Sequence, residues 1–576
     1  MKKIIHLIKK AWYYAWHRHH LLIPIPALKR YFKSFVRNIK RSGGISNNIF
    51  TSSKDYNKWL KDHPLKNIKC NNNLDITLLY TITNFSKERV INTLNSIFNS
   101  NCKKYCLTIA IFEKDYLKLN DLLKEIQPKK LTIKVITCNN NKSLADLYNS
   151  CLKDIYTDYT CFINSDVVFE NPSLNYIKKS IENGPDIIYS DEDHIDNKLS
   201  VSKPVFKPDY SLDSFLGYNY FGNVITIKTS LFKKVGIFNS KYLDNTFSEY
   251  LLRCVLISKK IVHIPDIIYH DFSILKNNFN SQIISDYLKN NKINAQVDVN
   301  PYNKDYVIRY NHNNPLVSII IPFKDQFKLT KECVTCILND LHYKKYELIL
   351  IDNGSQDKDL LNWLKHINNK KIKVFHNPMP FNFSSLCNYG VSKAKGDLYL
   401  FLNNDTKIID NDFLDWMVGY AQRKDIGAVG LKLLYNDKKI QHMGVVLTEG
   451  GYATHFGATE KDNKNGLFDM RIRPYNFSAV TGACLLIEKN KYKEVSGFDD
   501  RLSVALNDVD LCLKLLSKGY NNICLNNITM FHFESKSRGF DENSDSNNRL
   551  VEERNYMKNK WGRDTEIDKY YSKYFF

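Results

Sequence analysis

The chain has 576 residues, of which 82 are Lys or Arg and 61 are Asp or Glu, so its formal net charge is +21. Hydrophobic residues make up 43% and charged residues 25%, which is typical of globular domains and excludes disordered, collagen-like and disulfide-framework proteins. A chain of this length holds about two or three domains. Twelve basic residues and no acidic one precede Asp55, so the excess charge is concentrated at the N-terminus.

The N-terminal segment has the pattern of a basic amphipathic helix. Apolar residues recur every four positions from Ile4 to Trp16, and Lys2, Lys3 and Lys10 fall on the opposite arc. Such a helix binds the headgroup region of an anionic membrane, and docking on the protein's own core is the alternative. No apolar run approaches the ~18 residues that a membrane span needs. We predict that residues 1–72 form an arm and that the protein is cytoplasmic, peripheral on the inner face of the cell membrane.

Positive charge also attracts nucleic acid, because it binds any polyanion. Nothing later in the chain supplies a recognition module, so we expect no nucleic-acid partner. The thirteen cysteines include a single CxxC, Cys333 and Cys336, without a second pair. A zinc site needs four ligands, so we expect free thiols, which fit a reducing cytoplasm.

Two α/β patterns follow the arm, and the first opens at LDITLLYTIT (74–83). In the second, buried-strand runs alternate with amphipathic helices. The expected elements are the strand VSIIIPF (317–323), the helix LTKECVTCILNDL (329–341), the strands YELILIDNGS (346–355) and IKVFHNP (372–378), the helix SSLCNYGVSKAKG (384–396) and the strand DLYLFLNNDT (397–406). This order predicts an open, mostly parallel sheet that binds a nucleotide beyond the carboxyl ends of its strands.

The second pattern repeats the first. An offset of 239 residues aligns Asn388 with Asn149 and Asp405 with Asp166, without a gap. Further on the offset drifts to about 260, where VSGF meets VGIF and His532 meets His270. The sequence therefore predicts two copies of one domain, over residues 73–300 and 313–545, with a helical C-terminal tail over 546–576.

Acidic residues follow the strands of the second copy. Asp352 ends the second strand, where it either binds a ribose or caps the Asn-Gly turn that follows. Asp405 follows the fourth strand, and a carboxylate there suits Mg²⁺ or Mn²⁺ carrying a diphosphate. Asp508 and Asp510 open a later helix, where one would complement the helix dipole and the other would act as a general base.

His532 follows a short apolar strand near the end of the second copy. A lone histidine is usually structural, but this one precedes Lys536 and Arg538, which could neutralise phosphate. Imidazole together with carboxylate also suits manganese. We therefore keep His532 as a candidate metal ligand.

In this order the motifs resemble glycosyltransferase family 2, the inverting nucleotide-sugar enzymes of the GT-A fold, and especially its bacterial polysaccharide and O-antigen (rhamnosyltransferase-like) members. The segments that carry the likeness are IIIPFKD, LIDNGS, LFLNNDT, AVTGACLLIEK, VSGFDDRLSVALNDVDLCLKLLSKGY and HFESKSRG. The first half of the chain contains two further segments that resemble this family, IIYSDEDHID and HIPDIIYH. The resemblance implies an α/β fold of two tandem GT-A domains, each with a Rossmann-like, mostly parallel sheet.

The resemblance also implies roles for residues at matching positions. Asp508 would be the catalytic base, and Asp405 with His532 would hold the metal. The expected nucleotide contacts are Pro322, Asp325, Asp352, Asn388 and Asn404. The expected phosphate or acceptor contacts are Gly482, Asp510, Lys536 and Arg538. Asn403 stands at the first position of the family's DxD motif, where the family has an acid.

The first copy departs from the pattern. Glu113 replaces Asp352, Thr83 replaces Pro322, and Glu249 stands where Asp508 stands. Asp166 and His270 remain as candidate metal ligands, and Glu249 is a possible base. The first copy is therefore either a second active transferase or a degenerate structural copy.

The resemblance, together with the acidic residues after the strands, implies an inverting, metal-dependent hexosyltransferase-type enzyme that uses Mn²⁺ or Mg²⁺. It would move a sugar from a nucleotide-diphosphate donor to a hydroxyl of a growing, lipid-linked cell-surface polysaccharide. The alternatives are a bifunctional transferase with two active copies and a non-catalytic glycan-binding scaffold. A sugar nucleotidyltransferase is disfavoured, because PFKDQFKL lacks the glycine-rich loop that such an enzyme needs.

Overall fold

The computed structural model describes residues 53–70, 75–102, 104–126, 128, 131–273, 279–299, 305–448, 452–462, 465–533, 544–565, 568–572 and 574. The predicted amphipathic helix of the arm lies outside these residues. The described part of the chain contains no helix with both the length and the apolar character of a transmembrane span.

The first half of the chain builds a nine-stranded sheet that follows helix α3 (Ser53–Asp62). Its elements are β1 (Ile76–Ile82), α4 (Lys87–Phe98), β2 (Cys106–Phe112), α5 (Glu113–Ile126), β3 (Ile133–Cys138), α6 (Leu144–Leu152), β4 (Tyr159–Ile163), β5 (Val167–Phe169), α7 (Ser173–Ile181), β6 (Ile187–Ile195), β7 (Val201–Val205), α8 (Leu212–Gly217), β8 (Val224–Lys228), α9 (Thr229–Val235), η1 (Ser240–Asn245), α10 (Thr246–Ile257) and β9 (Ile261–Asp271). A connecting segment follows, with α11 (Ser281–Asn290), β10 (Ala295–Val299) and β11 (Tyr306–Tyr310).

The second half builds a ten-stranded sheet. Its elements are β12 (Val317–Phe323), α12 (Phe327–Asp340), β13 (Tyr346–Asp352), α13 (Lys358–His366), β14 (Ile372–His376), α14 (Phe383–Lys393), β15 (Leu398–Leu402), β16 (Thr406–Ile408), α15 (Phe413–Ala421), β17 (Ile426–Leu434), β18 (Ile440–His442), β19 (Val445–Thr448), β20 (Tyr452–His455), η2 (Leu467–Asp469), β21 (Pro474–Phe477), β22 (Cys484–Glu488), α16 (Lys489–Glu494), α17 (Asn507–Ser517), β23 (Asn521–His532), α18 (Ser544–Trp561) and η3 (Gly562–Thr565). Strands β19 and β20 form a separate hairpin.

The two sheets have the same strand order. The first runs β3-β2-β1-β4-β8-β6-β9-β5 and the second runs β14-β13-β12-β15-β22-β17-β23-β16. In each sheet the first four strands are parallel and the fifth is antiparallel to its neighbours. Strands β1 and β12 are buried along their whole length, as expected for parallel strands covered by helices on both faces. The predicted α/β fold with two tandem, mostly parallel sheets is confirmed.

The pairing register corrects the predicted alignment of the copies. Strand β12 follows β1 by 241 residues, whereas β15 follows β4 by 239. The first copy therefore has two extra residues between its second and third strands, which an ungapped alignment cannot detect. The counterpart of Asp352 is Ile111 and not Glu113, and the counterpart of Pro322 is Thr81 and not Thr83.

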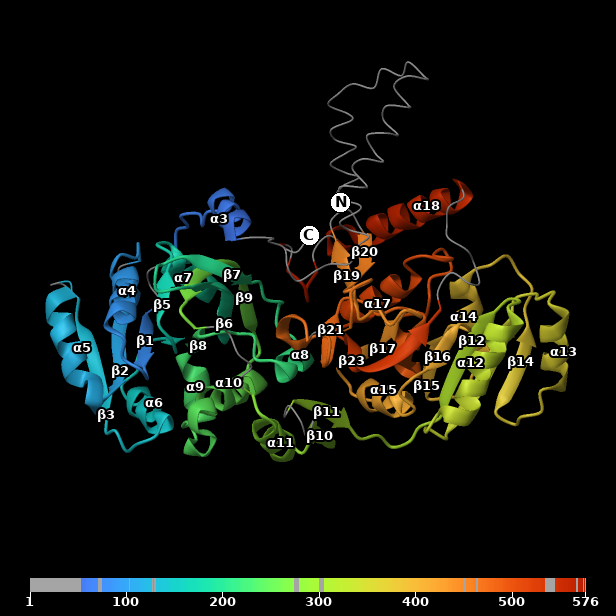
Figure 1. Ribbon diagram of the computed structural model, residues 1–576, viewed down its shortest axis with the longest axis horizontal. Coiled ribbons are helices and arrows are strands. Elements are labelled where there is room, and N and C mark those ends of the chain that lie inside the picture. The colour runs from blue at the N-terminus through green and yellow to red at the C-terminus, as the bar shows by residue number, and fades with distance from the viewer. Residues whose placement is uncertain are drawn as a thin grey trace, which may run out of the picture.

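The two sheets lie side by side along the long axis, and α8 and β21 meet between them (Figure 1). At this contact Arg423 forms a buried ion pair with Asp213. The Ser214 N–H donates to Asn476 Oδ1 at 3.3 Å, and the Asn476 N–H donates to Ser214 Oγ at 3.0 Å. Because these polar groups are buried and paired with each other, the contact fixes one copy against the other.

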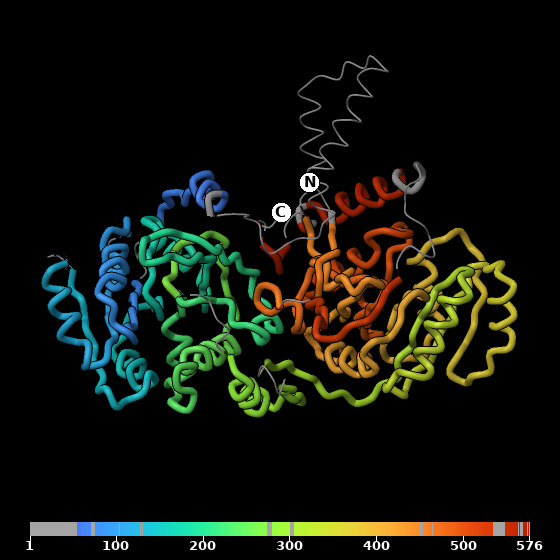
Figure 2. Tube along the Cα trace, in the orientation of Figure 1, coloured from blue at the N-terminus to red at the C-terminus, as the bar shows by residue number. Residues whose placement is uncertain are grey.

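The C-terminal residues contact both copies (Figure 2). The Leu447 N–H donates to Asp568 Oδ2 at 2.7 Å in the second copy, and the Asp209 N–H donates to Lys569 O at 3.0 Å in the first. The ring of Tyr574 packs edge-on against Trp59 of α3, with centroids 5.1 Å apart. The tail thus connects the second copy, the first copy and helix α3.

Candidate active site

The candidate residues of the second copy gather at one edge of its sheet. Strands β13, β15 and β23 run in the same direction, so their carboxyl ends meet there. Asp352 ends β13, Asp405 follows β15 and His532 ends β23. Gly482 precedes β22, which runs antiparallel to β15, so it lies at the same edge.

Asp405 and His532 form the centre of this edge. Asp405 is 4% exposed and His532 is 7% exposed. The Nε2 atom of His532 lies 3.1 Å from Asp405 Oδ1 and accepts a hydrogen bond from Asn403 Nδ2 at 3.2 Å. On the other side of the ring, Nδ1 lies 2.7 Å from Gln441 Oε1. An amide oxygen only accepts, so Nδ1 carries a proton, and Nε2 lies between Asn403 Nδ2 and Asp405 Oδ1.

This donor set fits a divalent cation. A carboxylate oxygen and an imidazole nitrogen lie 3.1 Å apart, and the ring carries a proton on its other nitrogen. Both are ligands for manganese-type ions, and a metal that carries a diphosphate takes further ligands from phosphate oxygens and water. Throughout the described ranges, no group of three or more His, Cys, Asp or Glu side chains is arranged to hold a metal ion by itself.

Asp508 lies at the start of α17, where it faces the turn before β22. Its Oδ2 accepts the Gly482 N–H at 2.8 Å, and its Oδ1 accepts the Val509 N–H at 2.8 Å. The side chain is half-buried. A Cβ atom at Gly482 would lie 3.6 Å from the Asp508 Cβ and 3.3 Å from the Phe383 ring, so the turn and the helix start are tightly packed. The carboxylate is therefore held in one orientation at the sheet edge.

Asp510 faces the opposite way from Asp508. It is fully buried, and its Oδ1 accepts hydrogen bonds from Lys560 Nζ at 2.7 Å and Trp561 Nε1 at 2.8 Å. Both partners belong to α18, which lies over α17 (Figure 1). From the same helix, Glu553 accepts the backbone N–H groups of Val504 and Ala505 at 3.0 Å each. Helix α18 thus holds the segment that leads into α17, a role that the sequence did not indicate.

Asp352 is buried and contacts the turn after its strand. Its Oδ1 accepts the Ser355 N–H at 2.9 Å, and its Oδ2 lies 2.8 Å from His376 Nδ1. The turn-capping contact therefore exists, and a role in nucleoside binding stays a prediction. Asp325, with φ of 55°, accepts the N–H groups of Gln356 at 2.6 Å and Asp357 at 2.9 Å. These bonds join the loops after β12 and β13.

Three further candidates have contacts within the protein. Pro322 is buried inside β12. Asn388 Oδ1 accepts the Phe498 N–H at 3.2 Å, and its Nδ2 donates to the Phe498 carbonyl at 3.0 Å. Asn404 is buried and donates to Thr330 Oγ1 of α12 at 2.9 Å. Their predicted nucleotide contacts stay predictions, and Lys536 and Arg538 lie outside the described residues.

The equivalent edge of the first copy has different groups. Asp166 accepts a hydrogen bond from the buried Tyr80 hydroxyl, and burial raises the pKa of the Asp166 carboxyl. Since Val167 pairs with Asp271 as Thr406 pairs with His532, Asp271 and not His270 holds the position of His532. The predicted match of His532 with His270 is therefore wrong by one residue.

His270 and Glu249 are both engaged by charged partners. Burial lowers the pKa of His270, but Asp193 at 2.5 Å from Nδ1 and Glu170 at 2.9 Å from Nε2 outweigh burial and raise it to about 9. Adjacent strand residues point to opposite faces, so His270 faces away from the side that Asp271 faces. Glu249 forms a bidentate ion pair with Arg253: Nε donates to Oε1 at 2.7 Å and Nη2 donates to Oε2 at 3.0 Å.

A buried ion pair lies against the glycine of the first copy that corresponds to Gly482. Gly222 is the counterpart of Gly482, because β8 and β22 pair with equivalent residues. A Cβ atom at Gly222 would lie 2.7 Å from Lys207 Nζ. Lys207 pairs with Glu192 at 2.8 Å, and both side chains are almost fully buried. The space in front of this glycine is therefore occupied.

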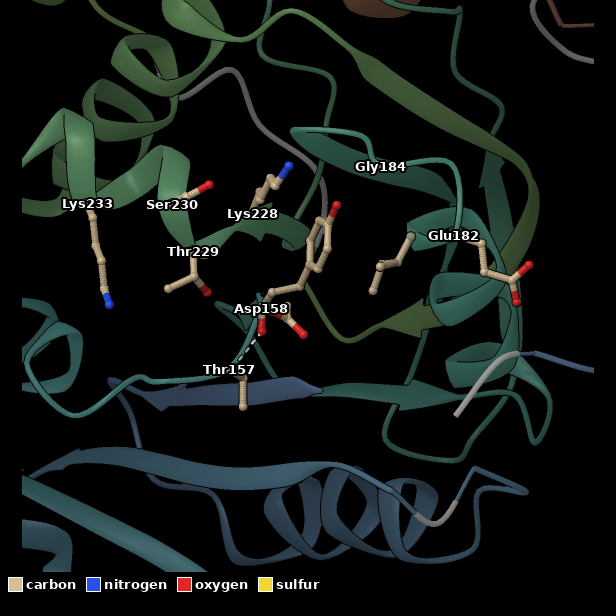
Figure 3. A pocket seen from close by; sticks show the side chains of 10 residues that line it. Thr157, Asp158, Glu182, Gly184, Lys228, Thr229, Ser230 and Lys233 are labelled. Atoms are coloured by element: carbon tan, nitrogen blue, oxygen red, sulfur yellow. Dashed lines mark hydrogen bonds between the residues drawn. The ribbon is translucent and has the colours of Figure 1, made fainter. Parts of the chain in front are cut away.

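A surface hollow of about 470 Å³ in the first copy lies at the other edge of that sheet. Figure 3 shows Asp158, Lys228 and Ser230 around it, at the start of β4 and the end of β8. Because Asp166 follows the opposite end of β4, this hollow is not the counterpart of the candidate site.

Comparison with known proteins supports these assignments of fold. Residues 318–496 match the family model described as glycosyl transferase family 2. An uncharacterized protein, y4gI, of Sinorhizobium fredii is 31% identical over 450 residues, which cover 74% of this chain and 50% of that protein. The O-antigen biosynthesis protein RfbC of Myxococcus xanthus is 28% identical over 436 residues, which cover 73% of this chain and 34% of that protein. The chain spans half or less of the length of these curated relatives.

Two solved structures also align with parts of the chain. The mannosyltransferase PcManGT from Pyrobaculum calidifontis, in complex with GDP-Man and Mn²⁺, is 15% identical and has a TM-score of 0.34, covering 48% of this chain and 71% of that chain. GalNAc-T7 with UDP, GalNAc and Mn²⁺ is 16% identical and has a TM-score of 0.37, covering 46% of this chain and 52% of that chain.

Proposed function

We propose that this chain, which contains a glycosyl transferase family 2 domain, moves a sugar from a nucleotide-diphosphate donor to a hydroxyl of a growing cell-surface polysaccharide, with inversion at the anomeric carbon. The observation that carries the proposal is the shared sheet edge. There the oriented carboxylate of Asp508 lies at the same edge as the Asp405–His532 pair. Asp508 suits removal of a proton from the acceptor, and the Asp405–His532 pair suits binding of a diphosphate with its metal ion.

Asp508 would act as the general base. Each of its oxygens accepts one backbone N–H group and keeps a second lone pair for the acceptor hydroxyl. As the hydroxyl oxygen attacks the anomeric carbon, its proton passes to Asp508. The bond from the anomeric carbon to the diphosphate oxygen breaks, and the nucleoside diphosphate leaves with the electron pair. A single displacement of this kind inverts the anomeric configuration.

Asp405 and His532 would hold Mn²⁺ or Mg²⁺. When bound, the cation neutralises the charge that develops on the departing diphosphate. The Asn403 amide donates to His532 Nε2, and the cation would take its place at that nitrogen. Lys536 and Arg538 would add positive charge beside the phosphates, and Asp352 and Asp325 would bind the nucleoside.

The first copy is proposed to be structural rather than a second active transferase. The Tyr80 hydroxyl donates to Asp166, the Lys207–Glu192 pair lies against Gly222, and Arg253 pairs with Glu249. Among the described residues of the first copy, these three carboxylates are therefore each engaged by a partner within the protein. A structural first copy disfavours the alternative of a bifunctional transferase with two active copies.

The acceptor is proposed to be a lipid-linked glycan at the cytoplasmic face of the membrane. The basic arm would hold the enzyme there, through electrostatic attraction to anionic lipids. The relative named for O-antigen biosynthesis is consistent with such an acceptor.

A panel of nucleotide sugars, tested for hydrolysis and transfer with Mn²⁺ or Mg²⁺, would test the proposal. The panel should be run on the wild type, Asp405→Ala and the matched control Asp166→Ala. We expect Asp405→Ala to lose about 10²–10³-fold in rate, because several kcal/mol of charge stabilisation disappear, and Asp166→Ala to retain activity. Loss with Asp166→Ala alone would assign catalysis to the first copy, and no turnover of any donor by the wild type would favour the glycan-binding scaffold.

A further inference from the structure

We propose that Gln441 and His442, adjacent residues of β18, are positioning residues for the two halves of the candidate site. Gln441 orients His532 on the diphosphate side, and His442 holds the turn before β22 on the acceptor side. The inference rests on the proposed function, because it assigns roles within that same site. Neither residue needs to touch substrate to act in this way.

Gln441 selects one tautomer of His532. Its side chain is 4% exposed, and its Oε1 lies 2.7 Å from His532 Nδ1. With Nδ1 protonated, Nε2, which lies 3.1 Å from Asp405 Oδ1, keeps the lone pair that accepts from Asn403 and that a cation would take. In the other tautomer an N–H group would face Asp405, and the ring would offer no ligand on that side. A partner on the second ring nitrogen therefore decides whether His532 can bind a cation.

His442 makes the corresponding contact on the acceptor side. It is 1% exposed, and its Nε2 accepts the Thr481 N–H at 3.4 Å. Its proton is then on Nδ1, which lies 2.8 Å from His455 Nδ1 and donates to it. Burial, followed by the nearby His455 and His532, lowers the pKa of His442 well below its usual range, which is consistent with a neutral ring.

The contact at Thr481 reaches the candidate base through the next residue. Gly482 follows Thr481, and its N–H donates to Asp508 Oδ2 at 2.8 Å. A chain of hydrogen bonds thus runs from His455 in β20 through His442 to the turn that orients Asp508. If the turn shifts, the Asp508 carboxylate loses its fixed donor.

The hairpin that supplies His455 belongs to the second copy. Between β6 and β8, where all residues of the first copy are described, the elements are β7 and α8. Between β17 and β22 the second copy instead has β18, the β19–β20 hairpin, η2 and β21. The additional strands therefore accompany the copy whose edge carries Asp508, as expected if they support its chemistry.

The Gln441 half can be tested on metal-free protein. Full-length chain labelled with ¹⁵N-histidine would report the tautomer of His532 by long-range ¹H–¹⁵N correlation, in the wild type, Gln441→Ala, Gln441→Glu and the surface control Lys439→Gln. We expect the Nδ1–H form in the wild type, its loss in Gln441→Ala and its retention in Gln441→Glu, whose carboxylate still accepts. Mn²⁺ binding in the presence of a nucleoside diphosphate should weaken by about 10–100-fold in Gln441→Ala only.

An unchanged His532 tautomer in folded Gln441→Ala would overturn this half of the proposal. The readout does not depend on turnover, so failure of the inference and failure of the proposed function remain distinguishable. If the wild type has no transferase activity, the proposed function is wrong. The His532 tautomer would still decide whether Gln441 orients that ring.

The His442 half predicts a split between kcat and nucleotide affinity. His442→Phe should lower kcat for transfer by about 10–100-fold and leave the nucleoside diphosphate Kd unchanged, because Asp508 touches the acceptor and not the nucleotide. His442→Asn, whose amide oxygen can still accept the Thr481 N–H, should recover part of the rate. An unchanged kcat in His442→Phe would refute the positioning role of His442. A loss of nucleotide affinity as large as the loss of kcat would also refute it.

Discussion

Replacing Asp508 with asparagine should abolish sugar transfer while the fold and nucleotide binding persist. The substitution keeps the side-chain shape, and an amide oxygen can still accept the Gly482 N–H that now binds Oδ2 at 2.8 Å. What disappears is the capacity to accept the acceptor's proton. General-base catalysis contributes about 10²–10⁴-fold in rate, which corresponds to about 3–5 kcal/mol of transition-state stabilisation. The assay is kcat for transfer, together with the nucleoside diphosphate Kd from calorimetry.

Asp510→Asn is the matched control, since Asp510 is two residues further along the same helix and binds α18. Its Oδ1 accepts from Lys560 and Trp561, so loss of its charge leaves the Lys560 ammonium with Asp499 as its remaining carboxylate partner. We expect about 1–3 kcal/mol of lost stability and a small change in kcat. Retained turnover in Asp508→Asn would exclude it as the base. A large loss of kcat in Asp510→Asn at unchanged stability would mean that Asp510, and not Asp508, is the carboxylate that acts at the sheet edge.

Two further predictions concern the first copy and the arm. His263 and His270, paired with Asp191 and Asp193, have pKa values raised to about 9 despite burial, so their stabilisation is full below about pH 6.5 and is lost as pH rises through about 9. The melting temperature should therefore fall between about pH 7 and 10, less steeply in His270→Gln, and a flat profile would contradict the pairing. Deleting residues 2–41 should release the protein from anionic vesicles in a sedimentation assay, whereas unchanged binding would rule out the arm as the membrane anchor.

The strands were predictable because parallel strands covered on both faces consist of continuous apolar runs. Strand β12 was predicted residue for residue as Val317–Phe323, and the helix predicted from Leu329 begins two residues earlier, at Phe327. The family resemblance is confirmed by the match over residues 318–496. The shared order of the two sheets confirms the repeat. Asp405 and His532 were expected to act together, and they lie 3.1 Å apart.

What the sequence could not reveal depends on contacts between distant residues. Gln441 and His532 are 91 residues apart, and only the pairing of β18 with β17 brings Gln441 to the sheet edge. The separate directions of Asp508 and Asp510 depend on where α18 packs, which no local pattern encodes. The two extra residues between β2 and β3 shifted the predicted counterparts of Asp352 and Pro322, because an ungapped offset conceals a short insertion.

The two copies differ in what their polar residues do, although their sheets are the same. In the first copy three consecutive carboxylates each pair with a cation: Asp191 with His263, Glu192 with Lys207, and Asp193 with His270. Buried charges persist only when they are paired in this way, and a neutralised set offers little to an incoming diphosphate. Asp193 also accepts a hydrogen bond from Tyr56 of α3. The charges of the first copy thus hold α3 against its sheet, whereas Asp508 of the second copy remains half-buried at the edge.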